Sequence, residues 1–411
     1  MKVSFVSRAA AAALSLAFLL TSAPPPRALA QSRRTPPQQP QKKNPRPDEQ
    51  QQPTTGQQEQ QPTVPPDAIK DTEVVKVASN IVQIEAVVYD KKSGRIVQGL
   101  KKENFAVFED GIQKEITNFS TPDAPITVSL VLEYSRLGQV QAYYGSSGQD
   151  RYGMGEMLGP TVSFLQQVVK PPQDYVSVIA YDMRPTPLTD FTNDPARITQ
   201  VINLLLVNQP VSNEANLFDA LKLTLVGGRA DSVVLENSKE SRADYGGMVD
   251  IKDNRRKAVF LITTGIDTFS KINYDQARKI VENAGIPIYI IGTGELFFKK
   301  YGDQMSPEDG LGGATTPGRM TMLQARNALR TFAEESGGAY FPITFPGELP
   351  TALQSINALM RSQYSLAYSV GERRDGKRHK IEVKVDVDGD GKYDDKEYVV
   401  KARQFFNAPK S

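Results

Sequence analysis

Residues 126–137 read Ile-Thr-Val-Ser-Leu-Val-Leu-Glu-Tyr-Ser-Arg-Leu. The first seven are rich in apolar and β-branched side chains, as expected of a strand buried on both faces of a sheet. The polar residues Glu133 and Ser135 follow directly. Ligands of open α/β sheets bind beyond the carboxyl ends of strands. The stretch therefore predicts a central strand that ends at a candidate binding edge.

The chain on the C-terminal side of this strand alternates between two patterns. Near-continuous apolar runs predict further strands at Val176–Tyr181, Ala258–Thr263 and Ile286–Ile291. This alternation predicts a doubly wound, mostly parallel α/β sheet over residues 125–362. Two polar stretches, 227–256 and 297–319, are predicted to be long surface loops. The predicted helices are Thr161–Val169, Pro195–Leu206, Leu217–Leu225, Tyr274–Asn283, Met322–Glu335 and Leu349–Met360.

β-rich sequence flanks the α/β part on both sides. Residues 71–124 form an N-terminal β unit, with turn sequences at Asp90–Gly94 and Glu109–Gly111. Residues 363–411 return to strand character. We expect the terminal strands to pair with the N-terminal unit, giving one accessory β-sandwich into which the α/β domain is inserted.

The N-terminal residues resemble a targeting signal. Lys2 and Arg8 precede a short apolar stretch, and Ala28-Leu29-Ala30 fits a signal-peptidase site, so residues 1–30 are predicted to be a signal peptide cleaved near Ala30. Residues 31–70, rich in Pro and Gln, are predicted to be a disordered linker. We therefore expect a secreted, periplasmic or envelope protein with no stable membrane span after cleavage.

Composition excludes several classes of function. The formal net charge is +2, which gives no reason to expect a nucleic-acid partner. The sequence has no cysteine and one histidine, so thiol chemistry, thiolate metal sites and Ser-His-Asp hydrolysis are all hard to build. His379 is interpreted as a solvated residue at a strand start. We predict no catalytic residues and no enzyme.

Three short motifs resemble those of von Willebrand factor A domains. Glu133-Tyr134-Ser135-Arg136-Leu137 resembles the family's Asp-x-Ser-x-Ser, the first part of its metal-ion-dependent adhesion site (MIDAS). Ala215–Ala220 resembles the threonine motif, and Ile262-Thr263-Thr264-Gly265 resembles the strand that ends in Asp-Gly. Residues 87–119 also resemble the leader that precedes this domain in secreted bacterial relatives. The resemblance covers about residues 73–408.

The resemblance implies a degenerate MIDAS. Oxygen remains at Glu133 and Ser135 and, more weakly, at Thr264, whereas Leu137 and Ala215 offer none. A hard cation needs several oxygen ligands, so we expect no magnesium at this rim. Glu133 is then an exposed carboxylate, or one paired with Arg136, although residual metal binding is the alternative. Asp267 is a possible substitute ligand, and Asp219 is expected to support its loop by hydrogen bonds.

A second acidic motif has the spacing of a calcium loop. Aspartates stand at positions 1, 3, 5 and 9, a glycine at position 6, a residue that offers its carbonyl at position 7, and a glutamate at position 12. The flanks predict strands instead of the helices of an EF-hand, and a plain acidic turn is the alternative. We predict calcium at 386–397, with the ligands Asp386, Asp388, Asp390, Lys392, Asp394 and Glu397.

These features favour a secreted or envelope-associated binding module. Its binding face is expected at the rim that contains Glu133 and Thr264, and its partner is a protein or an envelope polymer. The alternatives are a structural protein of an assembly and, with less support, an envelope hydrolase that uses a carboxylate pair or a Ser-Lys arrangement.

Overall fold

The computed structural model describes residues 80–136, 152–208, 210–231, 242–251, 255–309, 317–371 and 373–408. The chain divides into two compact units, Met1–Pro65 and Pro66–Ser411, and all of the described residues lie in the second. The predicted signal peptide, the linker and Leu137 lie outside the described residues. Within the described part, no helix combines the length and the apolar character needed to cross a membrane.

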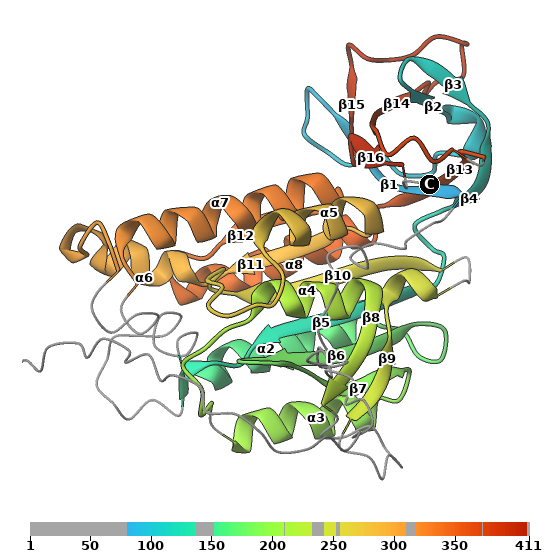
Figure 1. The fold of residues 1–411 in the computed structure, drawn as a ribbon. Helices are drawn as coiled ribbons and strands as arrows, with labels where there is room; N and C mark the ends of the chain where they lie inside the picture. The colour runs from blue at the N-terminus through green and yellow to red at the C-terminus, as the bar shows by residue number, and fades with distance from the viewer. Residues whose placement is uncertain are drawn as a thin grey trace, which may run out of the picture. The chain divides into compact units, whose positions relative to one another are not determined.

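A six-stranded sheet of order β12-β11-β10-β5-β6-β7 forms the centre of the α/β domain (Figure 1). Neighbouring strands from β12 to β6 run parallel, and β7 joins the edge antiparallel to β6. The predicted mostly parallel sheet is confirmed. The strands are β5 (Ile126–Glu133), β6 (Tyr175–Tyr181), β7 (Pro185–Thr192), β10 (Arg256–Thr263), β11 (Ile288–Gly292) and β12 (Ala339–Pro342).

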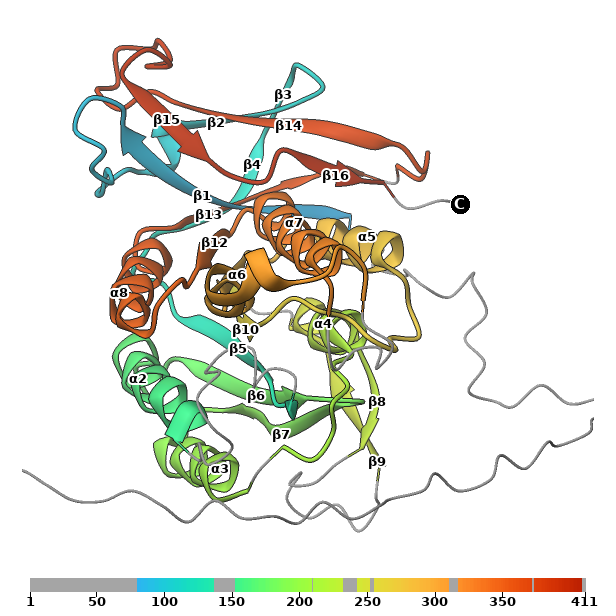
Figure 2. The same cartoon turned by 90° about the vertical axis from the view of Figure 1, so that its left-hand side faces the viewer.

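Helices cover both faces of this sheet, as Figure 2 shows. Alternate side chains of the central strand β5 divide between two cores: Leu130 packs with α2, α3 and α8, whereas Val131 packs with α4, α5 and α7. This explains why the strand sequence lacks polar alternation. The helices are α2 (Tyr152–Val168), α3 (Pro195–Val207), α4 (Leu217–Val226), α5 (Tyr274–Ala284), α6 (Gly294–Tyr301), α7 (Arg319–Ser336) and α8 (Leu349–Met360).

Local sequence fixes the ends of these helices. Asp194 caps α3 by accepting a hydrogen bond from the Ala196 amide at 2.9 Å, and Pro195 occupies the first turn. Asn273 and Gln276 form a reciprocal capping box at the start of α5. Such caps satisfy amides that the helix itself leaves without partners, and they explain why the predicted starts of α3 and α5 agree with the structure.

Two four-stranded antiparallel sheets form the accessory β-sandwich, in the orders β15-β1-β13-β4 and β16-β14-β2-β3. C-terminal β13 pairs with N-terminal β1, and β14 pairs with β2. The predicted pairing of the two termini is therefore confirmed. The strands are β1 (Ile81–Asp90), β2 (Phe105–Glu109), β3 (Ile112–Lys114), β4 (Ile116–Ser120), β13 (Tyr364–Ser369), β14 (Arg378–Val385), β15 (Tyr398–Lys401) and β16 (Phe405–Asn407).

The two predicted surface loops are wrong in part. The stretch 227–256 contains a hairpin of β8 (Gly227–Asp231) and β9 (Arg242–Gly246), which Tyr245 fastens by donating a hydrogen bond to Ser177 Oγ at 2.8 Å. The stretch 297–319 contains most of α6, and Phe298 packs there against a small cluster with Ile266. In the first stretch the buried Tyr245, and in the second the partly buried Phe298, anchors short elements that have no clear periodicity.

Candidate functional site

The candidate site lies at the carboxyl ends of β5 and β10. From β5 the chain continues to β6 on one side, and from β10 it continues to β11 on the other. The boundary between β5 and β10 is thus a topological switch point, where open α/β sheets bind their ligands. Glu133 ends β5, and Thr263 ends β10 directly opposite. The topology therefore places the predicted rim residues at the switch point.

The Glu133 carboxylate is enclosed by hydrogen-bond donors of the protein. Oε2 accepts from the Thr264 amide at 2.7 Å, from Thr264 Oγ1 at 2.9 Å and from Thr263 Oγ1 at 2.9 Å. Oε1 accepts from Ser135 Oγ at 2.9 Å. Glu133 is only 6% exposed. The expectation of an exposed or Arg136-paired carboxylate is wrong, because the glutamate chain is long enough to reach the end of β10.

Burial dominates the electrostatics of this carboxyl. Desolvation raises the pKa of Glu133 above its usual value, although the hydrogen bonds from Thr264, Thr263 and Ser135 oppose that change. Nearby, burial and the charge of Glu133 raise the pKa of Tyr181, whose hydroxyl donates to Thr263 Oγ1 at 2.7 Å. The site is a network of hydroxyl groups around one carboxyl that is unusually easy to protonate.

Among the described residues, the other rim positions add no oxygen to this network. Ala215 is completely buried, and its amide donates to Thr268 Oγ1 at 2.9 Å. Asp267 faces the start of α4, where its carboxylate accepts from the Phe218 amide at 3.0 Å. Asp219 accepts from the Lys271 amide at 3.0 Å, which is the loop-supporting role expected for it. Asp267 is therefore engaged in capping α4.

The carboxylate oxygens at the described part of the rim already have partners within the protein. A hard cation needs several oxygen ligands, some of which water can supply. Both oxygens of Glu133 already accept hydrogen bonds from protein groups, and the methyl group of Ala215 stands where the resemblance implies a threonine. The described part of the rim therefore forms a hydrogen-bond cage around Glu133, and the expectation of no magnesium there stays a prediction.

Apolar side chains are exposed around this cage. Met183, Val207, Val211 and Phe269, which we call the apolar rim residues, are 49%, 83%, 78% and 70% exposed. Asn216 holds two of their loops together, because its side-chain amide donates to the carbonyls of Met183 at 2.7 Å and Phe269 at 3.0 Å. The loops that present these side chains are therefore fixed by hydrogen bonds.

The turn after β5 forms hydrogen bonds with the segment that carries the other two apolar rim residues, Val207 at the end of α3 and Val211 beyond it. The Arg136 amide donates to the Ser212 carbonyl at 2.7 Å, next to Val211. The Tyr134 hydroxyl lies 2.6 Å from the Asn208 carbonyl, next to Val207. Tyr134 also lines a cleft of about 170 Å³, together with Tyr181, Leu188, Leu204 and Leu205. The rim thus combines exposed apolar side chains with a hollow about as large as one bulky side chain.

The acidic loop brings three of its predicted ligands together. Carboxylate oxygens of Asp386, Asp388 and Asp394 lie within 4.8 Å of one another. Asp390 instead accepts from the Lys392 amide at 2.8 Å, and Glu397 is exposed. Gly389 and Gly391 both have positive φ angles, of 78° and 85°, which the sharp turn of such a loop requires. Calcium binding at 386–397 remains a prediction.

Sequence reasoning missed two contributors to the site. The sequence pattern indicates Thr263 only as the end of a strand, yet its hydroxyl donates to the Glu133 carboxylate. Asn216 was quoted in a motif without a role, yet it fastens two rim loops. The available signal was the pair Thr263-Thr264 opposite a strand-end carboxylate, since two adjacent hydroxyl groups at a sheet edge can satisfy an acid.

Comparisons with known proteins concern the fold. No protein-family model matches the sequence, and no curated protein matches it. Among solved structures, an aerotolerance-related membrane protein from Bacteroides fragilis is 14% identical, with a TM-score of 0.35, over 57% of this chain and 98% of that one. The vWF domain of the type V pili tip protein Mfa5 from Porphyromonas gingivalis is also 14% identical, with a TM-score of 0.34, over 58% and 95%.

A third similar structure is the proximal thread matrix protein 1 from the mussel byssus. It is 12% identical, with a TM-score of 0.37, over 61% of this chain, and the chain spans about half of its length (50%). At these identities the likeness carries no inference about binding or activity. The α/β part of the chain is a doubly wound, mostly parallel sheet, and the motifs at its edge resemble those of von Willebrand factor A domains.

Proposed function

We propose that the protein is a secreted or envelope-associated interaction module, which binds a protein or an envelope polymer through its rim without a divalent cation. The observation that carries this proposal is the set of apolar rim residues on loops fixed by hydrogen bonds. Exposed apolar groups at a rigid surface favour association with a partner. Binding, and not catalysis, is the proposed activity.

The cage around Glu133 supports the cation-free part of the proposal. In a metal-dependent adhesion site, the cation offers a coordination position to an acidic group of the partner. Here the carboxyl is 6% exposed, and its oxygens are occupied by Thr263, Thr264 and Ser135. Recognition must therefore come from shape and from apolar contact. The cleft beside Tyr134 suits a bulky apolar side chain as the anchor of such a partner.

The rim can be tested by substitution of its exposed side chains. We expect the double variant Met183→Ser with Phe269→Ser to capture its partner from envelope extract at least about tenfold more weakly, because central apolar contacts carry most of the binding free energy. Immobilised mature protein and quantitative mass spectrometry of the bound proteins measure this.

The matched control changes exposed apolar residues outside the rim. Ile112→Ser with Val399→Ser alters side chains of the β-sandwich that are 66% and 39% exposed. Capture should be unaffected by this control, and it should be the same with and without magnesium. Capture that requires magnesium and ignores the Met183 and Phe269 substitutions would contradict the proposal.

We further propose that the acidic loop binds calcium and stiffens the connection between β14 and β15, which belong to the two different sheets of the sandwich. Isothermal titration of the mature protein with calcium should show one weak site, with a dissociation constant on the order of 10⁻⁴–10⁻³ M. Asp386→Asn with Asp388→Asn should abolish the heat, because two of the three clustered carboxylates lose their charge.

Asp395→Asn is the control for this titration. Asp395 belongs to the same acidic stretch, but its carboxylate pairs with Lys384 at 3.2 Å and it occupies no ligand position. Its substitution should leave calcium binding unchanged. Equal losses in both variants would show that the loop attracts cations only by its net charge.

A further inference from the structure

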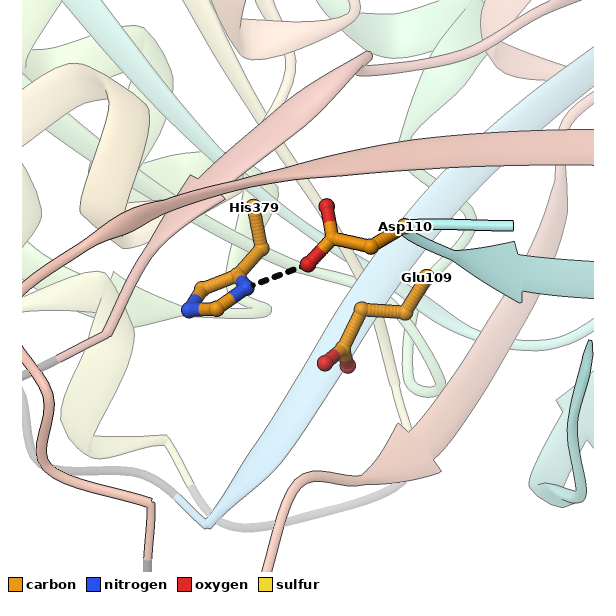
Figure 3. Close-up of side chains that lie close together, drawn as sticks. All are labelled: Glu109, Asp110 and His379. Carbon is orange, nitrogen blue, oxygen red and sulfur yellow. Dashed lines mark hydrogen bonds and ion pairs between the residues drawn. The ribbon is translucent and has the colours of Figure 1, made fainter. Parts of the chain in front are cut away.

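A second group of metal-ligating side chains lies in the β-sandwich, away from the rim and the acidic loop. Glu109 ends β2, Asp110 begins the turn to β3, and His379 is the second residue of β14. Ligand atoms of all three lie within 4.8 Å of one another, and Figure 3 shows the three side chains converging. We call these residues the Glu109–Asp110–His379 cluster. His379 is 7% exposed, so its interpretation as a solvated residue is wrong.

The backbone fixes two of the three ligands. Asp110 and Gly111 have φ angles of 50° and 83°, as a two-residue hairpin turn between β2 and β3 requires. The Lys380 amide donates to Asp110 Oδ1 at 2.9 Å, which leaves Oδ2 for His379. The imidazole itself is stacked on the ring of Phe406 at a centroid distance of 5.1 Å. Both side chains are thus held before any ligand arrives.

A third carboxylate orients the histidine. Nε2 of His379 lies 3.1 Å from both oxygens of Asp375, whereas Nδ1 lies 2.7 Å from Asp110 Oδ2. A histidine that binds a metal commonly donates its other ring N–H to a carboxylate, and this fixes the tautomer. Without an ion Nδ1 donates its proton to Asp110 Oδ2, and a metal would replace that proton while Nε2 keeps its hydrogen bond to Asp375.

The buried Glu109 carboxylate supplies an independent sign of a missing ligand. Its side chain is 1% exposed, and its Oε2 has no partner at hydrogen-bond distance, although the buried Tyr368 hydroxyl, which has none either, interacts with this carboxylate. Oε1 is paired with Arg373 and lies 3.8 Å from Lys114. An unpartnered carboxylate oxygen is costly to bury unless a cation or a donor satisfies it. The Glu109 carboxylate lies beside His379 and Asp110 in Figure 3, with a ligand oxygen within 4.8 Å of theirs.

We propose that the Glu109–Asp110–His379 cluster binds a divalent transition metal of the zinc class. Nδ1 of His379 and carboxylate oxygens of Asp110 and Glu109 are the ligands, and Asp375 is the positioning residue. One imidazole and two carboxylates form a ligand set that zinc accepts, with a further position left for water. Asp110 is 48% exposed, which gives an ion access.

Arg373 is the group that the metal displaces. Its guanidinium contacts Glu109 and lies 3.4 Å from His379 Nδ1, so it occupies part of the space between the ligands. Its side chain is 33% exposed. A side chain that is already one-third exposed can rotate into solvent at little cost in free energy. The site is therefore expected to bind zinc more tightly when this competing cation is removed.

The experiment is titration of the untagged mature protein with zinc alone, by calorimetry. The sequence contains one histidine and no cysteine, so any nitrogen ligation must involve His379. We expect one zinc per chain. His379→Gln should abolish binding, Arg373→Ala should tighten it by about tenfold, and Asp375→Asn should weaken it by about 10–100-fold. Asp388→Asn, in the acidic loop, should leave it unchanged.

A chemical probe tests the proposal on the unaltered protein, without any substitution. Diethyl pyrocarbonate reacts with imidazole, and the only imidazole here is His379. Zinc should slow that reaction in the unaltered protein, whereas magnesium should not. The proposal is overturned if zinc neither binds nor protects, if binding survives His379→Gln, or if only the Arg373→Ala chain binds zinc.

Discussion

Arg403→Met is expected to destabilise the protein by about 3 kcal/mol, one of the two largest effects of the substitutions considered. Arg403 is 4% exposed, and its guanidinium donates to three backbone carbonyls: Glu282 at 2.8 Å, Phe405 at 3.0 Å and Gln83 at 3.5 Å. Those carbonyls belong to α5, β16 and β1. Methionine fills a similar length but offers no donor, so the carbonyls would lose a charged partner.

The surroundings of Arg403 show that this position joins the α/β domain to the β-sandwich. Gly285, the C-cap of α5, has φ 61°, and a Cβ there would collide with the Arg403 guanidinium. Burial lowers the pKa of Arg403 to about 10, so the side chain remains charged at neutral pH. A positive charge at the carboxyl end of a helix is favourable to its dipole. Arg403 therefore acts as a donor at a junction where little water is available.

Arg378→Met is the matched control for this prediction. Arg378 pairs with Glu282 at the same junction, with a Nε–Oε1 distance of 2.6 Å, but its side chain is 41% exposed. Ion pairs that are accessible to solvent contribute about 1 kcal/mol or less. Urea unfolding of both variants measures the difference. An equal loss for Arg378→Met and Arg403→Met would show that burial of the donor is not what matters.

The sequence alone predicts the strands that consist of long apolar runs. The runs 126–132 and 258–263 predicted β5 and β10 because strands buried on both faces have no polar alternation. The hairpin of β8 and β9 was not predictable in this way. Its residues are polar or small, and it is held by one buried aromatic residue, Tyr245. An element that depends on a single tertiary contact leaves no periodic signal.

The site shows the same limit at the level of side chains. Sequence placed Glu133 and Thr264 at one edge, because both follow predicted parallel strands. It did not give the direction of the carboxylate, which depends on Thr263 and Thr264, more than a hundred positions away in the chain. The burial of His379 likewise depends on Asp110, which is distant in sequence but adjacent across the β2–β14 pair. Contacts of that kind require the register of the strands.

Glu133→Ala is expected to cost about 2–4 kcal/mol. Its removal leaves the amide of Thr264 and the hydroxyl groups of Thr263 and Ser135 without their acceptor, and buried donors without partners cost about 1–3 kcal/mol each, partly recovered by rearrangement of the hydroxyls. Glu133→Gln should cost less than about 1 kcal/mol at pH 5, because its carbonyl oxygen can accept from Thr264 and rotatable hydroxyls can accept from its amide.

The pH dependence of these variants tests the protonation of the cage. Burial raises the pKa of Glu133 in the folded protein above the usual 4.5, so the folded state keeps its proton to higher pH than the unfolded state does. The stabilisation is complete below pH 4.5 and is lost as the pH rises toward the folded-state pKa, with a slope of at most about 1.4 kcal/mol per pH unit. The glutamine of Glu133→Gln cannot titrate. The free energy of unfolding of this variant, relative to that of the natural chain, should therefore rise over this pH window.

Urea unfolding of the natural chain and of Glu133→Gln between pH 4 and pH 8, with and without magnesium, measures the result. A carboxylate that held a cation would behave in the opposite way. Its pKa would be lowered, the natural chain would gain stability with rising pH, and magnesium would add to that gain. A glutamate enclosed by Thr263, Thr264 and Ser135 gives a falling curve that magnesium does not change. The sign of the slope thus distinguishes a hydrogen-bond cage from a metal site, even where the size of the effect is small.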